Sequence, residues 1–109
     1  MSEREERVAR NEVTSREINE GIEEAHTADS REGHVRMVCE CGQTECQRLI
    51  AITIGEYEDV REDPRRFALV KEHVMLDVER VVYETDRFVV VKKREGTPAE
   101  VAEEEDPRS

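Results

Sequence analysis

Apolar and polar residues alternate along "HVRMVC" (34–39), and this period of two predicts a short β-strand with one apolar face. The β-branched run "RLIAITI" (48–54) follows soon after, and we expect it to return antiparallel to the first strand. Two more β-rich runs within residues 78–93 flank the polar pair Thr85-Asp86, which predicts a hairpin.

Two segments have the character of helices. Residues 3–25 favour a helix, but their apolar stripe is thin, so the helix must dock on the core or on a partner, or fray. That predicted stripe consists of Val8, Ile18, Ile22 and Ala25, with Val13 off it. Further along, Thr53-Ile-Gly-Glu56 matches a capping box and predicts a short middle helix over residues 55–63, which Pro64 ends.

The remaining segments are polar. "HTADSREG" (26–33) predicts a linker, and the acidic segment 95–109 has almost no apolar side chain to bury, which predicts a disordered tail. The sequence therefore divides into an acidic N-terminal helix and linker (1–32), a core (33–94) and an acidic tail (95–109). The predicted fold class is a small α+β domain with an N-terminal helix, about four short antiparallel strands and one short middle helix.

Charge is distributed unevenly over the 109 residues. The net charge is -11, of which residues 1–32 carry -5, residues 33–94 carry -1 and residues 95–109 carry -5. An acidic chain repels phosphate backbones, so we expect no nucleic-acid partner. The best basic patch is Lys92-Lys93-Arg94, and three charges at the end of a strand are typical of a solvated edge.

No apolar run approaches the roughly 18 residues of a membrane span. The first residues, "MSEREERVAR", also lack the apolar region of a signal peptide. We therefore expect no membrane association and a cytoplasmic protein, in which thiols stay reduced. Clustered cysteines in that compartment usually bind metal or carry out redox chemistry.

All three cysteines lie within "VCECGQTECQ" (38–47). On an extended backbone Cys39 and Cys41 leave the same face, and Gly42 allows a tight turn that aims backbone amides at sulfur. Cys46 can then return to the same point, which makes a one-sided knuckle of three thiolates. A zinc ion needs three or four such ligands at tetrahedral angles, so zinc is the predicted cofactor.

Several alternatives stay open on this pattern. The cysteines could be buried as small apolar residues, although polar neighbours argue against it, or could form a redox switch that uses Cys46. An iron–sulfur cluster usually requires four cysteines. Three thiolates also leave a fourth zinc position, for which the candidates are His34, His73, His26 or a water molecule.

Motifs along nearly the whole chain carry a resemblance: "RNEVTSREINEGI", "VCECGQTEC", "TIGEYEDVREDPRRF", "DVERVVYETDRFVVVKK" and "VAEEEDPRS". The chain resembles a family of small uncharacterised bacterial proteins that have a V-C-E-C-G segment, a third Cys close behind and a His after the D-P-R-R-F stretch. In that family the His commonly follows Pro-Gly, whereas here His73 stands in "VKEHV". The resemblance implies a Cys₃His metal site of Cys39, Cys41, Cys46 and His73, and no assigned activity.

Chain entropy also allows His73 as the fourth ligand, because the cost of closing a loop grows only logarithmically with its length. His34 should instead point away from Cys39 on an ideal strand. We predict a non-enzymatic protein-interaction or regulatory module with a structural zinc and an unidentified protein partner. The alternatives are a redox- or metal-responsive switch that uses the three cysteines and, least favoured, a zinc enzyme with water in the fourth position.

Overall fold

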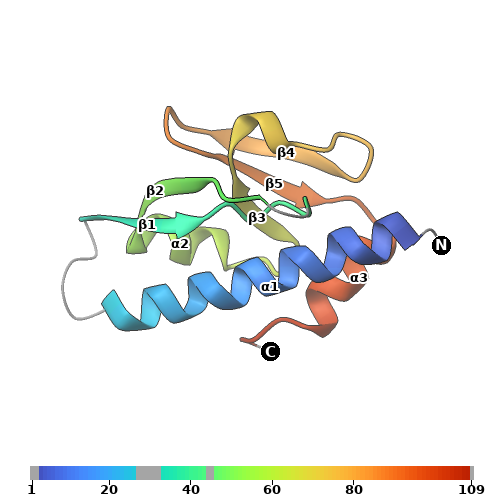
Figure 1. Cartoon of the computed structure of the whole chain (residues 1–109), viewed down its shortest axis with the longest axis horizontal. Coiled ribbons are helices and arrows are strands. Elements are labelled where there is room, and N and C mark those ends of the chain that lie inside the picture. Colours follow the sequence, from blue (N-terminus) through green and yellow to red (C-terminus); the bar gives the residue numbers. More distant parts are fainter. Residues whose placement is uncertain (1–2, 27–32, 44–45, 109) are drawn as a thin grey trace.

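Two small antiparallel sheets lie along one side of a long N-terminal helix in the computed structural model of the chain (Figure 1). The structure describes residues 3–26, 33–43 and 46–108, so most of the predicted linker, at 27–32, lies outside the described residues. The elements in chain order are α1 (Glu3–His26), β1 (His34–Val38), β2 (Leu49–Thr53), α2 (Ile54–Val60), β3 (Arg66–Leu69), the 3₁₀ turn η1 (Lys71–His73), β4 (Glu79–Glu84), β5 (Val89–Lys93) and α3 (Thr97–Glu104).

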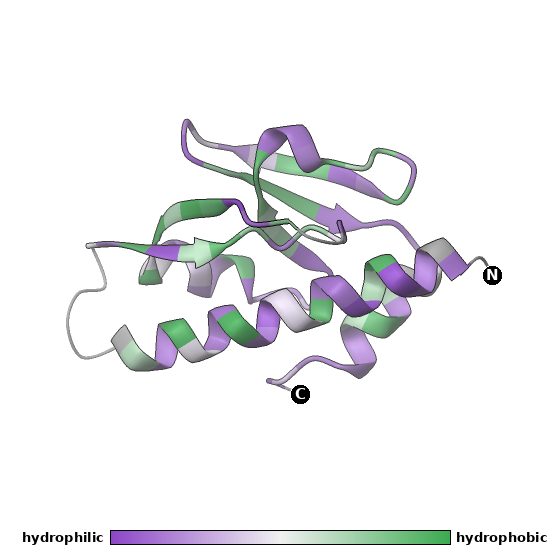
Figure 2. Ribbon diagram, in the orientation of Figure 1, coloured by the Kyte–Doolittle hydropathy of each residue, from purple (hydrophilic) through white to green (hydrophobic). Residues whose placement is uncertain are grey.

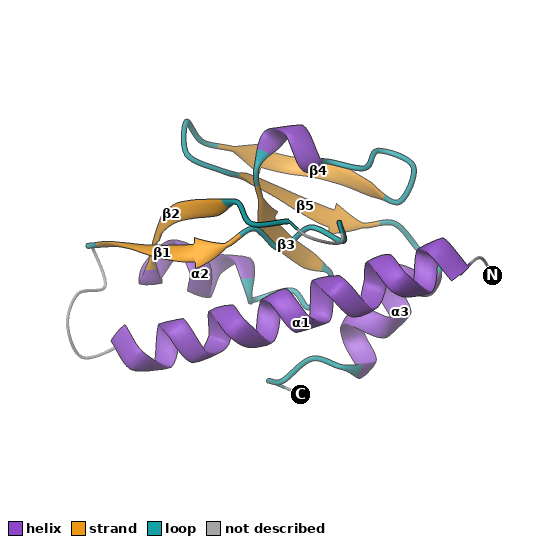
Figure 3. Ribbon diagram, viewed as in Figure 1, coloured by secondary structure: helices purple, strands orange, loops and turns teal. Residues whose placement is uncertain are grey.

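The predicted strand pairings are confirmed. β1 pairs antiparallel with β2, with His34 opposite Thr53 and Val38 opposite Leu49. The second sheet has the order β3-β5-β4 (Figure 3), and it contains the predicted hairpin together with β3, a strand that was not predicted from the sequence. The α+β fold class is therefore confirmed, and the described residues contain five strands in place of about four.

The capping box at the start of α2 is also confirmed. The Thr53 hydroxyl accepts a hydrogen bond from the Glu56 N–H at 3.0 Å, and the Glu56 carboxylate accepts one from the Thr53 N–H at 2.8 Å. Arg87 adds two hydrogen bonds to the same carboxylate, and they lower the pKa of Glu56 to about 2. Glu56 thus joins the start of α2 to the loop between β4 and β5.

Apolar side chains of both sheets and of α2 form the core. Figure 2 shows hydrophobic residues along the strands, whereas α1 is a mixture of hydrophilic and hydrophobic turns. The fully buried apolar residues of this core include Met37, Ile52, Tyr57, Phe67 and Val90. No helix in the described part of the chain is long and apolar enough to cross a membrane.

The predicted apolar stripe of α1 is only partly its docking face: Val8 is buried against Gly42 and Ile22 packs against the core, but the other two members do not. Ile18 is 48% exposed and Ala25 is exposed, whereas Val13, which lies off the stripe, is buried. The buried face carries polar residues as well, namely Glu12, Arg16, Asn19 and Glu23. Apolar periodicity cannot identify such a face, because its burial is favourable only when each polar group finds a partner in the folded chain.

Arg16 shows how one of these polar residues is satisfied. Its guanidinium donates to the backbone oxygens of Pro64 and Arg66, each at 2.7 Å. It also lies 3.9 Å above the ring of Phe67, which is a cation–π contact. Arg16 therefore anchors the middle of α1 to the segment that leads into β3.

A buried charge cluster anchors the first half of α1. The Lys93 ammonium pairs with the carboxyl groups of both Glu12 and Glu79, and all three side chains are buried. The expectation that Lys92-Lys93-Arg94 forms a solvated edge is therefore wrong at its central residue. Alternation along β5 turns Lys93 inward, where the two carboxyl groups compensate its charge.

The C-terminal segment differs from the predicted disordered tail. Residues 97–104 form α3, whose Ala99 and Ala102 are buried. Gly96 precedes α3 with a φ of 132°, a conformation that favours glycine. Further on, Arg108 donates to the carboxylates of Glu20, Glu23 and Glu58. Two buried alanines and several ion pairs attach this segment. A search of the sequence for large apolar residues detects neither the alanines nor the ion pairs.

Replacing Glu12 by Gln should reduce the pH dependence of stability. Burial raises the pKa of Glu12 from 4.5 to about 8, so the folded chain retains a proton that the unfolded chain has lost. The contribution of Glu12 to the free energy of unfolding should therefore fall as the pH rises from about 5 to about 8. Gln cannot ionise, so Glu12→Gln should lose less stability over this interval in urea unfolding. An equal loss in both proteins would contradict the assignment.

Candidate metal centre

The two sheets position Cys39 and its neighbours. Directly after β1, the Cys39 N–H donates to the Arg48 oxygen at 3.0 Å, which continues the pairing with the chain before β2. The next residue, Glu40, turns to the other sheet and donates its N–H to the Ala68 oxygen of β3 at 2.9 Å. Residues 39–41 are thus an extended bridge between the sheets, and both of its cysteines are buried.

Gly42 follows this bridge where the chain passes close to α1. A Cβ atom at position 42 would lie 2.2 Å from Val8 Cγ1 and 2.9 Å from Val8 Cα, so a side chain cannot be accommodated there without movement of the helix. Among the glycines that the structure describes, a positive φ is found at Gly96 and not at Gly42. The glycine of the knuckle is therefore required by close packing against α1 rather than by a left-handed backbone.

His73 reaches the cysteines from η1, the turn after β3. Its backbone N–H donates to the Val70 oxygen at 3.0 Å, which closes the turn, and the Val70 N–H donates to Cys39 Sγ at 3.2 Å. His73 Nδ1 lies 3.7 Å from Cys39 Sγ and 3.5 Å from Cys46 Sγ. One short segment, 70–73, thus supplies both an amide to a sulfur atom and an imidazole to the cluster.

The four side chains are grouped closely enough to offer their ligand atoms to one metal ion. The ligand atoms of Cys39, Cys41, Cys46 and His73 all lie within 4.8 Å of one another. Bond lengths of about 2.3 Å for Zn–S and about 2.0–2.1 Å for Zn–N give tetrahedral edges of about 3.6 Å from S to N and about 3.8 Å from S to S. The two measured sulfur–nitrogen distances agree with the first value. The group is positioned to bind a metal ion.

Backbone amides supply positive dipoles to all three sulfur atoms. Val70 donates to Cys39, Gln43 to Cys41 and Arg48 to Cys46. A hydrogen bond from the Cys39 thiol, together with the Gln43 amide, lowers the pKa of Cys41 to about 5. The same thiol–thiolate bond raises the pKa of Cys39, and burial raises that of Cys46. Cys41 therefore holds the negative charge first, and Cys39 and Cys46 keep their protons.

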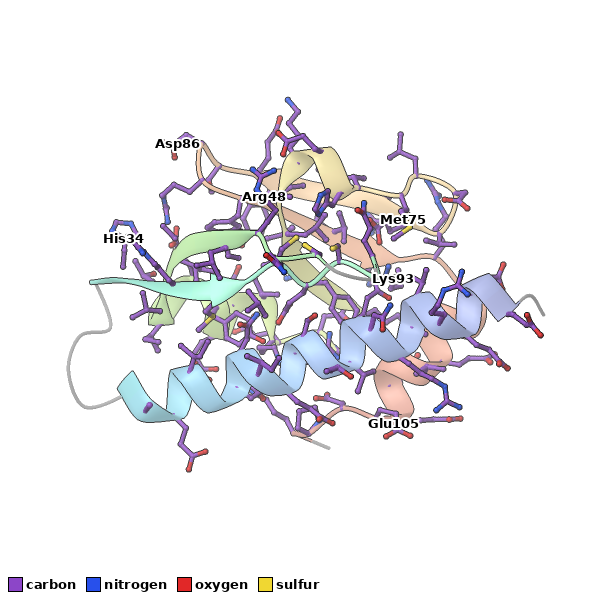
Figure 4. All side chains as sticks on the ribbon, viewed as in Figure 1. His34, Arg48, Met75, Asp86, Lys93 and Glu105 are labelled. Atoms are coloured by element: carbon purple, nitrogen blue, oxygen red, sulfur yellow. The ribbon has the colours of Figure 1, made fainter. Side chains whose placement is uncertain are left out.

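The other two histidines differ in position from His73. His34 begins β1 and is exposed, and Figure 4 shows it at the outer end of that strand, away from the grouped sulfur atoms. The expectation that His34 is a surface residue is confirmed. His26 is the last residue of α1, and its side chain lies outside the described part of the structure.

Two buried residues beside the site, Glu40 and Asn19, were not predicted from the sequence. Glu40, between the two cysteines, is fully buried, and Asn19 of α1 is fully buried beside it. The Asn19 amide donates to a Glu40 carboxylate oxygen at 3.0 Å. Alternation was the available signal, because a backbone that places Cys39 and Cys41 on one face places Glu40 on the opposite one.

No family model, curated protein or solved structure matches the chain. The resemblance to small bacterial proteins with a V-C-E-C-G segment therefore stays a prediction. The geometry of the four side chains supports a metal site without any relative.

Replacing His73 by Ala should weaken metal binding by about two orders of magnitude or more. Loss of groups that merely orient a metal ligand already costs 10–100-fold, and His73 is the candidate ligand itself. The matched control is His34→Ala, which removes an exposed imidazole and should leave affinity unchanged. A competition titration against a colorimetric chelator measures both variants. A larger loss in His34→Ala, or none in either variant, would show that His73 is not the fourth ligand.

Proposed function

We propose that this protein is a small zinc-binding module in which the zinc is structural and the activity is interaction with another protein. The observation that carries the proposal is the convergence of Cys39, Cys41, Cys46 and His73 within 4.8 Å. Three sulfur atoms and one imidazole nitrogen form a donor set typical of structural zinc sites. An iron–sulfur cluster is less suitable, because it generally requires four cysteines.

A closed site supports a structural role over catalysis. A catalytic zinc ion keeps one position for water or substrate, whereas four protein donors fill a tetrahedral zinc ion. Three thiolates also donate charge to the metal and make it a weaker Lewis acid. The bound zinc would supply folding free energy by joining the β1–β2 hairpin to the turn after β3.

The partner that the charges favour is a basic protein surface. A groove between α1 and α3 is lined by Glu6, Glu100, Glu104 and Glu105 together with Arg10. The whole chain carries -11, so a nucleic acid would be repelled. We also propose a cytoplasmic location, where reduced thiols remain available to zinc.

A thiol-based switch is the second candidate, and the position of Cys46 favours it. Cys39 and Cys41 are 3% and 2% exposed, whereas Cys46 is half-buried and lies nearer to solvent. An oxidant would therefore reach Cys46 first, and its modification would remove one of the four donors. In this second reading the zinc site reports on the redox state of the cell.

The purified protein should contain one zinc ion per chain when it is prepared under reducing conditions with zinc supplied. Removal of the ion by a strong chelator should lower Tm by more than about 10 °C, because the free energy of binding is also free energy of folding. Elemental analysis and thermal unfolding measure the two effects. Cys46→Ser is the matched control, and it should have a low Tm that the chelator does not change. A wild-type protein that contains no zinc, or whose Tm does not change when the chelator is added, would exclude a structural zinc.

A further inference from the structure

Helix α1 holds the segment 39–41 on the side that faces away from the candidate metal site. The Asn19 amide group donates to the Val38 oxygen at 2.9 Å and accepts from the Val38 N–H at 2.8 Å. One side chain thus pairs with the free edge of β1 as a neighbouring strand would. This pairing lies immediately before Cys39, so it fixes the backbone from which the first candidate ligand projects.

Glu40 attaches the centre of the same bridge to three elements. One carboxylate oxygen accepts from Asn19 Nδ2 of α1 at 3.0 Å and from the Tyr57 hydroxyl of α2 at 2.6 Å. The other oxygen accepts from the Ala68 N–H of β3 at 3.0 Å. Glu40 is fully buried, so the loss of one donor would leave part of a charged group without compensation.

The end of the bridge also contacts α1. Asn11 Nδ2 donates to the Gly42 oxygen at 3.0 Å, and Val8 packs so closely that position 42 has no room for a Cβ atom. The helix therefore touches residues 38, 40 and 42 in succession, whereas Cys39 and Cys41 face the candidate metal site. Movement of either thiol would therefore disturb the helix contacts made by the residues on both sides of it.

We infer that Asn11, Asn19 and Glu40 are positioning residues of the metal centre: they set its affinity without touching the ion. It follows that metal binding and docking of the middle of α1 favour each other, because both require the same backbone conformation at 38–42. The inference rests on the proposed function, since it concerns the affinity of the same site.

Other contacts hold α1 independently of the bridge, and this makes the inference testable. Glu12 pairs with Lys93, Arg16 donates to backbone oxygens before and within β3, and Arg108 pairs with Glu20 and Glu23. A variant that loses only Asn19 therefore keeps α1 attached on both sides of position 19. Its effect on the metal can be separated from general unfolding.

The test compares zinc affinities of Asn19→Ala, Asn11→Ala and the wild type by competition with a colorimetric chelator. Asn19→Ala should bind zinc about 10–100-fold more weakly, the loss typical of groups that orient a metal ligand. Asn11→Ala removes a hydrogen bond from a partly exposed side chain to the Gly42 oxygen, so it should show a smaller loss in the same direction. This variant serves as the test if Asn19→Ala does not fold. Ile18→Ala alters the exposed neighbour of Asn19 and should bind like the wild type.

Arg108→Ala is the control for stability. It removes ion pairs to α1 and α2 that do not contact residues 38–42, so it should lower Tm and leave zinc affinity unchanged. Equal losses of affinity in Arg108→Ala and Asn19→Ala would overturn the inference in favour of general destabilisation. An unchanged affinity in Asn19→Ala and Asn11→Ala would also overturn it.

Amide hydrogen exchange supplies the reciprocal measurement. Zinc should slow exchange in the middle of α1 of the wild type, and the slowing should be smaller in Asn19→Ala, because a coupling between two events acts equally in both directions. If the protein binds zinc but zinc does not change exchange in α1, the inference is overturned and the proposed function is not. A wild-type chain that binds no zinc overturns the proposed function, and the inference with it.

Discussion

The extended segment 39–41 positions both the candidate metal ligands and the contacts with α1. Side chains of an extended chain alternate, so two thiols project to one face and the carboxylate of Glu40 projects to the other. The first face gathers Cys46 and His73, and the second receives a hydrogen bond from each of α1, α2 and β3. The candidate metal centre and the helix interface are therefore two sides of one segment.

The helix interface is specified by polar pairings more than by apolar contact. A buried polar group is tolerated only when its hydrogen bonds are made, so each of Glu12, Arg16 and Asn19 admits few alternative registers for α1. Polar pairing also explains why the predicted apolar stripe coincides with the docking face only in part. Ile18 and Ala25 face outward because the partners of the polar residues lie on the opposite side.

Features encoded by neighbouring residues could be predicted from the sequence, and features that depend on distant partners could not. Both predicted strand pairings and the capping box of α2 follow from local patterns, and the three cysteines lie within eight residues of one another. The inward position of Lys93 depends on Glu12 and Glu79, and α3 depends on the helix it lies against. His73 was selected by loop-closure reasoning and by a resemblance; its neighbours do not mark it as a ligand.

The charge of the metal centre also follows from the geometry. Without an ion, one thiolate at Cys41 is compatible with protonated Cys39 and Cys46, so the cluster carries about one negative charge. With a divalent ion, three thiolates and a neutral imidazole again sum to about one negative charge, because two protons leave as the metal enters. The surrounding amides of Val70, Gln43 and Arg48 thus meet a similar charge in both states.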